Sequence, residues 1–398
     1  MKKILLCSIF FFIIFPCFSV DNTNPRYDET YVKFVSGSIA DKTEILENLK
    51  ISENTPILTA RLPEKALMFV SRNFKEIGII KGMKELAAVA IPHISITNSN
   101  QAELLWDIFE IIDDNDIRLE IILKMNFAYP KQKLIVETFL PEIHDFIANS
   151  VENGFYTRTS CLAAIELLGK VSDASSFDLL FKLLCSNYND LLSSSVVAAL
   201  DSILPKTEDF ILNFINKETL NIKEKLLLFD LILKNENFSS VLKSEIAQNI
   251  LYLNIINIEK VSSVNSDVKQ LQMLAIRRIK DSAWMKAAST VSDFFPIAVQ
   301  EFEYNILNEQ ELIEIIDCLR TLATTQSVAV LSSYLGTINN EVAKEIFSYN
   351  ENIILAVIKT LGVLGDKMAF DNLLYVTYLP YSEQITSAAS IALAGLKW

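Results

Sequence analysis

The chain has 398 residues, 51% of them hydrophobic, and a formal net charge of −13 at pH 7. This charge argues against general nucleic-acid binding and against electrostatic docking to anionic lipid, because both need clustered Lys and Arg. The length suits either two ordinary domains or one elongated array of repeats. With 9 glycines in all, the chain has little material for a phosphate-cradling glycine loop.

Residues 1–19, MKKILLCSIFFFIIFPCFS, have the layout of a cleavable signal peptide. Two lysines precede an apolar run of about a dozen residues, which is shorter than the roughly 20 residues of a spanning helix. Small residues at Cys17 and Ser19 predict cleavage after Ser19, and the loss of two lysines takes the charge from −13 to −15. We expect an exported protein of the periplasm or cell envelope, with no integral membrane segment after signal removal.

Two alternatives for the N-terminus stay open. The leader can remain as an uncleaved membrane anchor, or Cys17 can carry a lipid. Pro16 stands directly before that cysteine, where a lipidation site favours a small residue, and this fits lipid attachment poorly.

After the leader, residues 20–50 are predicted to form a flexible lead-in and an N-terminal cap, and residues 51–154 degenerate helical repeats. Helical periodicity is seen in residues 65–74, 83–90, 104–112, 117–125 and 134–146. No sustained alternation of apolar and polar residues suggests a sheet, and no linker-like composition marks a sharp domain boundary.

One turn in this region is rich in acids, namely Glu110, Asp113, Asp114 and Asp116. Their spacing does not match an EF-hand loop, and no glycine makes the bend that calcium loops require. We interpret this stretch as a polar turn between helices. The 2 histidines, His93 and His144, are far apart in the sequence and have no Cys or Asp at ligand spacing, which argues against a zinc site. The sequence also lacks the G-x-S-x-G motif of a serine nucleophile, and we predict no metal, no cofactor and no catalytic residue.

Residues 155–398 repeat one pattern, which is clearest when Gly169 and Gly362 are aligned. The aligned position then holds Gly169, Asp201, Arg277, Arg320, Gly362 and Ala394. The residue before it is apolar in each copy: Leu168, Leu200, Ile276, Leu319, Leu361 and Leu393. So is the second residue after it: Val171, Ile203, Ile279, Leu322, Leu364 and Leu396. Residues three apart share one face of a helix, so each copy presents an apolar stripe that another element must cover.

Residues suited to start a new helix stand four positions after the aligned residue: Asp173, Pro205, Asp281, Thr324 and Asp366. Asp and Thr side chains accept hydrogen bonds from the first N–H groups of a helix, and Pro suits its first turn. The pattern therefore predicts a helix, a tight turn and a second, capped helix.

The segments LLGKVSDASSFDLLFKLL (residues 167–184) and TLGVLGDKMAFDNLLYV (residues 360–376) resemble HEAT repeats, in particular the short type of phycobilisome lyases. The resemblance extends over residues 157–205 and 352–396, and more weakly over 268–294 and 312–335. It implies an all-α fold, an α-solenoid of stacked antiparallel helix pairs in an armadillo-type superhelix. The usual arginine of the first helix is present at Arg158 alone, and the usual proline after the turn aspartate is absent.

The resemblance indicates a specific fold but implies almost nothing about activity. We expect an exported, non-enzymatic scaffold or assembly factor that binds a protein or peptide partner. The alternatives are a HEAT-like enzyme of the lyase or hydrolase type, as in bilin lyases and DNA glycosylases, and a purely structural envelope component.

Two groups of residues are candidates for a special role. Arg277, Arg278 and Arg320 are predicted to offer a cationic site for an acidic partner segment, since guanidinium groups grip carboxylates in bidentate fashion. Salt bridges to neighbouring acids of the same chain are the alternative. For the cysteines within apolar helical patterns we expect buried free thiols, while a Cys161–Cys185 disulfide is the alternative for an exported chain.

Overall fold

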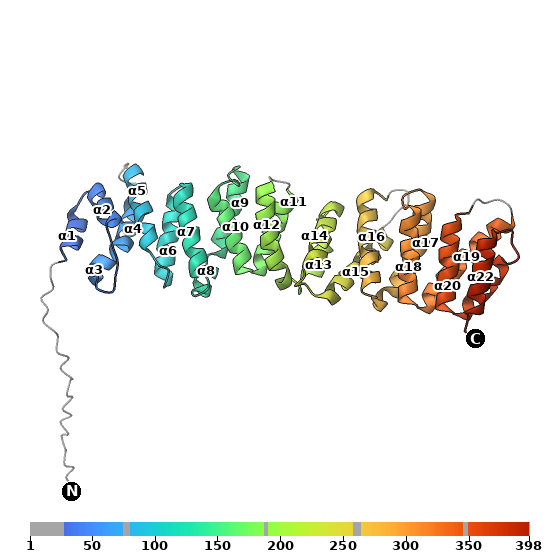
Figure 1. The fold of residues 1–398 in the computed structure, drawn as a ribbon. Helices are drawn as coiled ribbons and strands as arrows, with labels where there is room; N and C mark the ends of the chain where they lie inside the picture. Colours follow the sequence, from blue (N-terminus) through green and yellow to red (C-terminus); the bar gives the residue numbers. More distant parts are fainter. Residues whose placement is uncertain (1–27, 75–79, 187–189, 258–263, 345–348, 398) are drawn as a thin grey trace, which may run out of the picture. The chain divides into compact units, whose positions relative to one another are not determined.

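The computed structural model describes residues 28–74, 80–186, 190–257, 264–344 and 349–397. Regular structure in these residues is helical, apart from one isolated β-bridge between Asp366 and Lys397. The helices pack against their neighbours in chain order, which confirms the predicted all-α solenoid (Figure 1). The predicted signal peptide, residues 1–19, lies outside the described residues. Among the described helices, none has the length and apolar character needed to cross a bilayer.

The chain forms two compact units, Met1–Leu167 and Leu168–Trp398, with the boundary inside helix α10. Unit 1 contains α1 (Glu29–Ser36), α2 (Ile39–Glu47), α3 (Ile57–Ala60), α4 (Leu62–Asn73), α5 (Ile80–Ala90), η1 (Ile91–His93), α6 (Ser99–Ile111), α7 (Asn115–Ala128), α8 (Lys133–Glu137), α9 (Leu140–Glu152) and the start of α10 (Thr159–Val171). Within this unit α2 packs on α5, α4 on α5 and α6, and α6 on α7.

One predicted helix of unit 1 is in fact two. Residues 134–146 were expected to be continuous, but α8 ends at Glu137 and α9 begins at Leu140. Pro141 lies in the first turn of α9, where its missing N–H costs nothing. A proline in the middle of a longer helix would remove a hydrogen bond, so the chain breaks before it instead.

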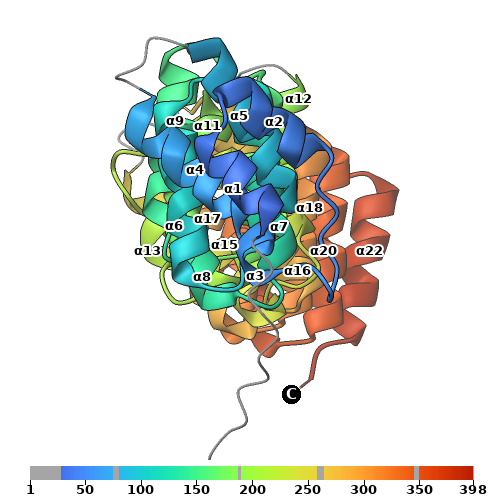
Figure 2. The ribbon, with the colours of Figure 1, turned by 90° about the vertical axis from the view of Figure 1, so that its left-hand side faces the viewer.

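Unit 2 contains the rest of α10, η2 (Ala174–Ser176), α11 (Phe177–Cys185), α12 (Asp190–Ile203), η3 (Leu204–Lys206), α13 (Ile211–Ile215), α14 (Ile222–Lys234), α15 (Ser240–Asn257), α16 (Ser266–Asp281), η5 (Met285–Ala287), α17 (Ala288–Glu303), α18 (Glu309–Leu322), α19 (Thr325–Ala343), α20 (Glu351–Leu364), η6 (Lys367–Ala369), α21 (Phe370–Val376) and α22 (Glu383–Ala394). From α14 onward the helices alternate between two layers. The first-helix layer is α14, α16, α18, α20 and α22, and the second-helix layer is α15, α17, α19 and α21. Figure 2 shows α18, α20 and α22 side by side in the first of these layers.

The apolar stripe of the repeat is the core of this arrangement. Ten of its twelve members are buried: Leu168, Val171, Leu200, Ile203, Ile276, Ile279, Leu319, Leu322, Leu361 and Leu396. The two half-buried members, Leu364 and Leu393, belong to the last two first-layer helices. Since α22 is the last described helix, it has a neighbour in its layer on one side, where α20 packs.

The predicted caps are present in three repeats. Asp173, Thr324 and Asp366 each precede a new helix and accept a hydrogen bond from its first backbone N–H groups. Pro205 stands in the first turn of η3, as expected. In these three capped repeats the residue just before the cap has a left-handed backbone, with φ of 54° at Ser172, 48° at Ala323 and 68° at Gly365.

The prediction for Asp281 is wrong, because this residue is the last of α16 and not a cap. The left-handed turn comes later here, at Ala283, with φ of 45°. Arg278 and Lys280 lie in the last turn of α16, where positive charge stabilises the carbonyl end of a helix and favours its extension.

Two glycines allow close approach of neighbouring helices, α10 to α12 and α20 to α22. A Cβ atom added at Gly169 would lie 2.8 Å from the Cα atom of Ala199, and one added at Gly362 would lie 2.9 Å from that of Ala392. A Cβ atom does not fit so close to a backbone atom, so Gly169 and Gly362 must be without a side chain.

Candidate protein-binding surface

The three predicted arginines each contact a different residue of the chain. Arg277 Nε lies 3.0 Å from Glu314 Oε2, and Arg320 Nη2 lies 3.0 Å from Asp317 Oδ1. Arg278 bonds elsewhere: its Nη2 donates to the carbonyl and the hydroxyl of Ser240, at 2.6 and 2.7 Å. Arg277 of α16 thus pairs with α18, Arg320 pairs within its own helix α18, and Arg278 contacts the start of α15.

Glu314 joins two cations on α16. Lys280 Nζ lies 3.0 Å from Glu314 Oε1, in addition to the contact with Arg277. Burial by itself would raise the pKa of Glu314, but the hydrogen bonds and charges of Lys280 and Arg277 bring this pKa below its ordinary value. The salt bridges expected as the alternative are therefore present. Binding of an acidic partner by these arginines stays a prediction.

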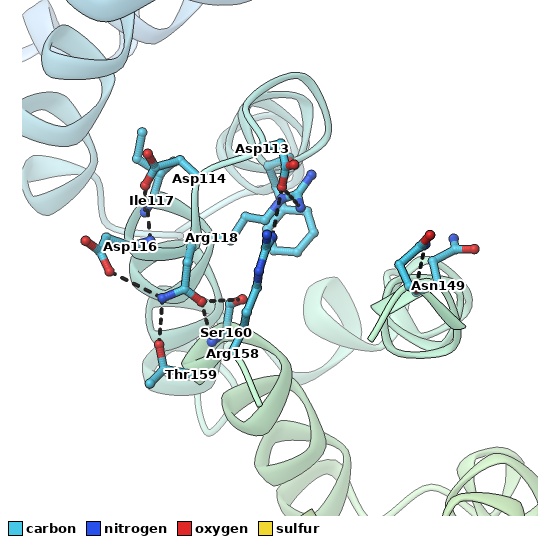
Figure 3. A network of polar contacts seen from close by, with 12 residues as sticks. Asp113, Asp114, Asp116, Ile117, Arg118, Asn149, Arg158, Thr159 and Ser160 are labelled. Carbon is cyan, nitrogen blue, oxygen red and sulfur yellow. Dashed lines mark hydrogen bonds and ion pairs between the residues drawn. The ribbon is translucent and has the colours of Figure 1, made fainter. Parts of the chain in front are cut away.

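The acidic turn of unit 1 is occupied by contacts within the chain (Figure 3). Asp113 Oδ1 accepts from Arg118 at 2.7 Å and from Arg158 at 3.1 Å, and Asp114 caps α7 by accepting from the backbone N–H groups of residues 116 and 117. Next to it, Asn115 bonds to Thr159 and Ser160 at the start of α10. This turn ties α7 to α10 within unit 1. In the described residues no group of three or more His, Cys, Asp or Glu could hold a metal ion.

The three described cysteines are free thiols, so the Cys161–Cys185 disulfide is not formed. Burial raises the pKa of Cys161 and that of Cys185 to about 11, and that of Cys318 to about 12. Because the thiolate is the reactive form, these groups are inert at neutral pH. Cys161 and Cys318 are buried as expected, whereas Cys185 is half-buried.

A groove between α17 and α19 lies on the second-helix layer of unit 2. We call it the α17–α19 groove; it encloses about 380 Å³. Its apolar wall includes Phe295, Val299, Tyr334 and Ile338, and the rings of Phe295 and Tyr334 meet edge to face with centroids 5.4 Å apart. A second hollow of about 300 Å³ shares Tyr334 and Ile338 and continues toward Ile353 and Ile354 of α20.

The polar groups of this groove are acidic. Glu303 of α17 and Glu341 of α19 line it, and neither carboxylate pairs with a Lys or Arg in the described part of the chain. Burial, followed by the negative charges of Glu303 and Glu341, raises the pKa of Tyr334 to about 12. The phenol is therefore neutral, and the structure shows no hydrogen bond to its hydroxyl from the described residues.

Sequence reasoning did not single out Glu303, Tyr334 or Glu341. Each sits on a helix whose apolar periodicity indicates the buried face, but periodicity does not show which exposed residues of two helices will face each other. The only available signal was the concentration of aromatic residues in the segment DFFPIAVQEFEY, residues 293–304.

Comparison with known proteins does not assign the chain to a family. Neither a scan of protein-family models nor a search of curated proteins finds a match to the chain. The functional argument therefore rests on the residues themselves.

Proposed function

We propose that this chain is an exported, non-enzymatic α-solenoid of the short HEAT-like type. It acts as a scaffold or assembly factor by binding a protein partner in the periplasm or cell envelope. The partner contributes a helix or an extended segment that lies along the second-helix layer of unit 2. Stacked helix pairs form continuous grooves of this kind, and a segment gains affinity by placing apolar side chains between neighbouring helices.

The observation that supports this proposal most is the α17–α19 groove. It is open, its walls are aromatic and aliphatic, and its carboxylates at Glu303 and Glu341 form no ion pair with the residues that the structure describes. Another hollow of about 290 Å³ lies in the same layer against α15, where Trp284 Nε1 donates to Gln248 Oε1 at 2.8 Å. A surface that alternates apolar pockets with polar anchors suits a protein segment better than it suits a small molecule.

Site-specific photo-crosslinking in the native host tests this function. A benzoylphenylalanine is placed at Thr337, which is exposed in the α17–α19 groove, or at Val363, which is 69% exposed on α20 of the first-helix layer. We expect one discrete protein adduct from Thr337 and none from Val363. Equal labelling of both positions, or no adduct from either, would contradict a partner on the second-helix layer.

The arginine hypothesis is a separate arm of the same experiment. The variant Arg277→Glu/Arg320→Glu inverts the charge on the α16–α18 side and leaves the groove unchanged. If an acidic partner segment also docks there, the yield of the Thr337 adduct should drop severalfold. An unchanged yield would assign these arginines to the salt bridges with Glu314 and Asp317 alone.

A further inference from the structure

The two sides of the α17–α19 groove differ in what they can bind. Phe295, Val299 and Ile338 offer apolar contact, which is non-directional and suits any aliphatic or aromatic side chain. Glu303 and Glu341 provide two acceptor carboxylates near one tyrosine hydroxyl. A ligand of this groove must therefore present an apolar group and a hydrogen-bond donor close together.

The negative charge of Glu303 and Glu341 determines which kind of hydrogen-bond donor the groove prefers. Among the described residues, no Lys or Arg lines the groove or the hollow that continues from it. The protein as a whole carries a formal net charge of −13, so its long-range field also attracts cations. Glu303 is exposed and Glu341 half-buried, so the two carboxylates would repel an anionic segment and offer a neutral segment no charge pairing.

We propose that the α17–α19 groove binds a partner segment in which a Lys or Arg side chain stands next to an apolar residue. This inference rests on the proposed function and specifies the partner's chemistry. The cationic head group lies between Glu303 and Glu341 and donates to the hydroxyl of Tyr334. The apolar neighbour fills the space between Phe295, Val299 and Ile338.

The larger hollows of unit 1 do not carry such an argument, since the hollow beside α1 and α2 is lined by Lys33 and Lys50 as well as Asp41 and Glu44. In unit 1 a hollow of about 710 Å³ lies between α4 and α6, and its lining includes Arg61 and Arg72 as well as Glu103 and Asp107. Charges of both signs give no preference for a cationic or an anionic ligand. The α17–α19 groove differs because its charge has one sign.

Selection from a random peptide library tests the inference without knowledge of the natural partner. The processed full chain is immobilised, and phage-displayed peptides are enriched on it. The best peptide is then synthesised, together with a copy in which norleucine replaces its Lys or citrulline its Arg. Their affinities are measured by fluorescence anisotropy at low and at high salt, since screening weakens partly exposed ion pairs.

Two variants probe the groove. Glu303→Gln/Glu341→Gln removes both charges without changing the shape, and Tyr334→Phe removes the hydroxyl alone. The matched control is Glu166→Gln/Glu218→Gln, which changes two exposed acids outside the groove and lowers the negative charge equally. Circular dichroism verifies that all variants are folded.

We expect enriched peptides with Lys or Arg beside an aromatic or aliphatic residue. Binding should weaken by roughly tenfold in the Glu303/Glu341 variant and severalfold in Tyr334→Phe, and stay unchanged in the control. If bound peptides lack a cation, or if the double variant binds them as tightly, the cationic specificity is wrong while a Thr337 adduct still supports partner binding. If no peptide is enriched, the groove is not a peptide site, and crosslinking decides the proposed function independently.

Discussion

Glu301 of α17 is buried beside Gln272, and each of the two side chains has one oxygen without a hydrogen bond. Gln272 Nε2 donates to Glu301 Oε1 at 3.1 Å, while Glu301 Oε2 and Gln272 Oε1 have no hydrogen-bond partner in the described part of the chain. Both free atoms are acceptors, so the pair lacks one donor, and a proton on Glu301 supplies it. Burial and the nearby charge of Glu311 raise the pKa of Glu301 to about 7, against the opposing effects of Gln272 and Lys269.

This raised pKa predicts a pH-dependent stability. The native state holds the proton more tightly than the unfolded chain, whose Glu pKa is near 4.5. The proton on Glu301 therefore contributes fully to the free energy of unfolding below about pH 4.5. This contribution, on the order of 3 kcal/mol, is lost as the pH rises through about 7. We expect the free energy of unfolding of wild type, relative to that of Glu301→Gln, to fall by this amount between pH 4.5 and 8.

Urea unfolding over this pH range measures the difference, since other acids titrate equally in both proteins. Glu166→Gln serves as the control, because Glu166 is exposed and should show no such trend. A constant difference between wild type and Glu301→Gln would mean that Glu301 stays ionised in the folded protein.

At the scale of the element, the distance between the first helices of neighbouring repeats depends on which residue occupies the aligned position. Where it is glycine, the next helix approaches to contact, as at Gly169 with Ala199 and at Gly362 with Ala392. Where it is Arg277, a salt bridge to Glu314 of the next helix takes the place of that contact. The same structural position is thus used in two ways, by close packing and by charge.

We predict that Gly169→Ala and Gly362→Ala destabilise the protein by about 1–3 kcal/mol each, because the added methyl group overlaps the facing backbone. Helix propensity acts in the opposite direction by about 1 kcal/mol, since alanine is the better helix former. Thermal unfolding followed by circular dichroism decides which effect is larger. The neighbouring change Val363→Ala, on an exposed side chain, should alter stability by less than about 0.5 kcal/mol. A rise in stability on either Gly→Ala change would show that moving the helices apart costs less than the gain in helix propensity, which would contradict the prediction.

For the whole molecule, the compartment determines which partners are available. Residues 1–19 have the composition of a cleavable leader, and we predict that the mature chain begins at Val20. Intact-mass measurement of the protein from its native host should show the loss of these residues. Ser19→Trp should block cleavage and leave the precursor, because the site accepts small residues. Retention of Met1 in the native protein, or a lipid on Cys17, would replace this prediction by one of its alternatives.

Much of the fold was predictable because its signals are local. The spacing of apolar residues located the paired helices, and Asp173, Thr324 and Asp366 marked where second helices start. Predictions failed where two local signals in the same stretch favoured different structures. Asp281 is a good cap by type, yet α16 continues to include it, and the proline after Leu140 divides a helix that periodicity alone would continue.

The sequence by itself determined most of the helices, the apolar stripe that each repeat buries and the helix starts at Asp173, Thr324 and Asp366. These features depend on residues within one or two helical turns of each other. Only the tertiary structure decided that Arg277 faces Glu314, that Gln272 meets Glu301 in the core, and that Glu303 and Glu341 flank one groove. Such pairings join different helices, and they depend on how far each helix is rotated and shifted against the next. Packing of whole side-chain surfaces sets that arrangement, and a pattern read along one helix does not contain it.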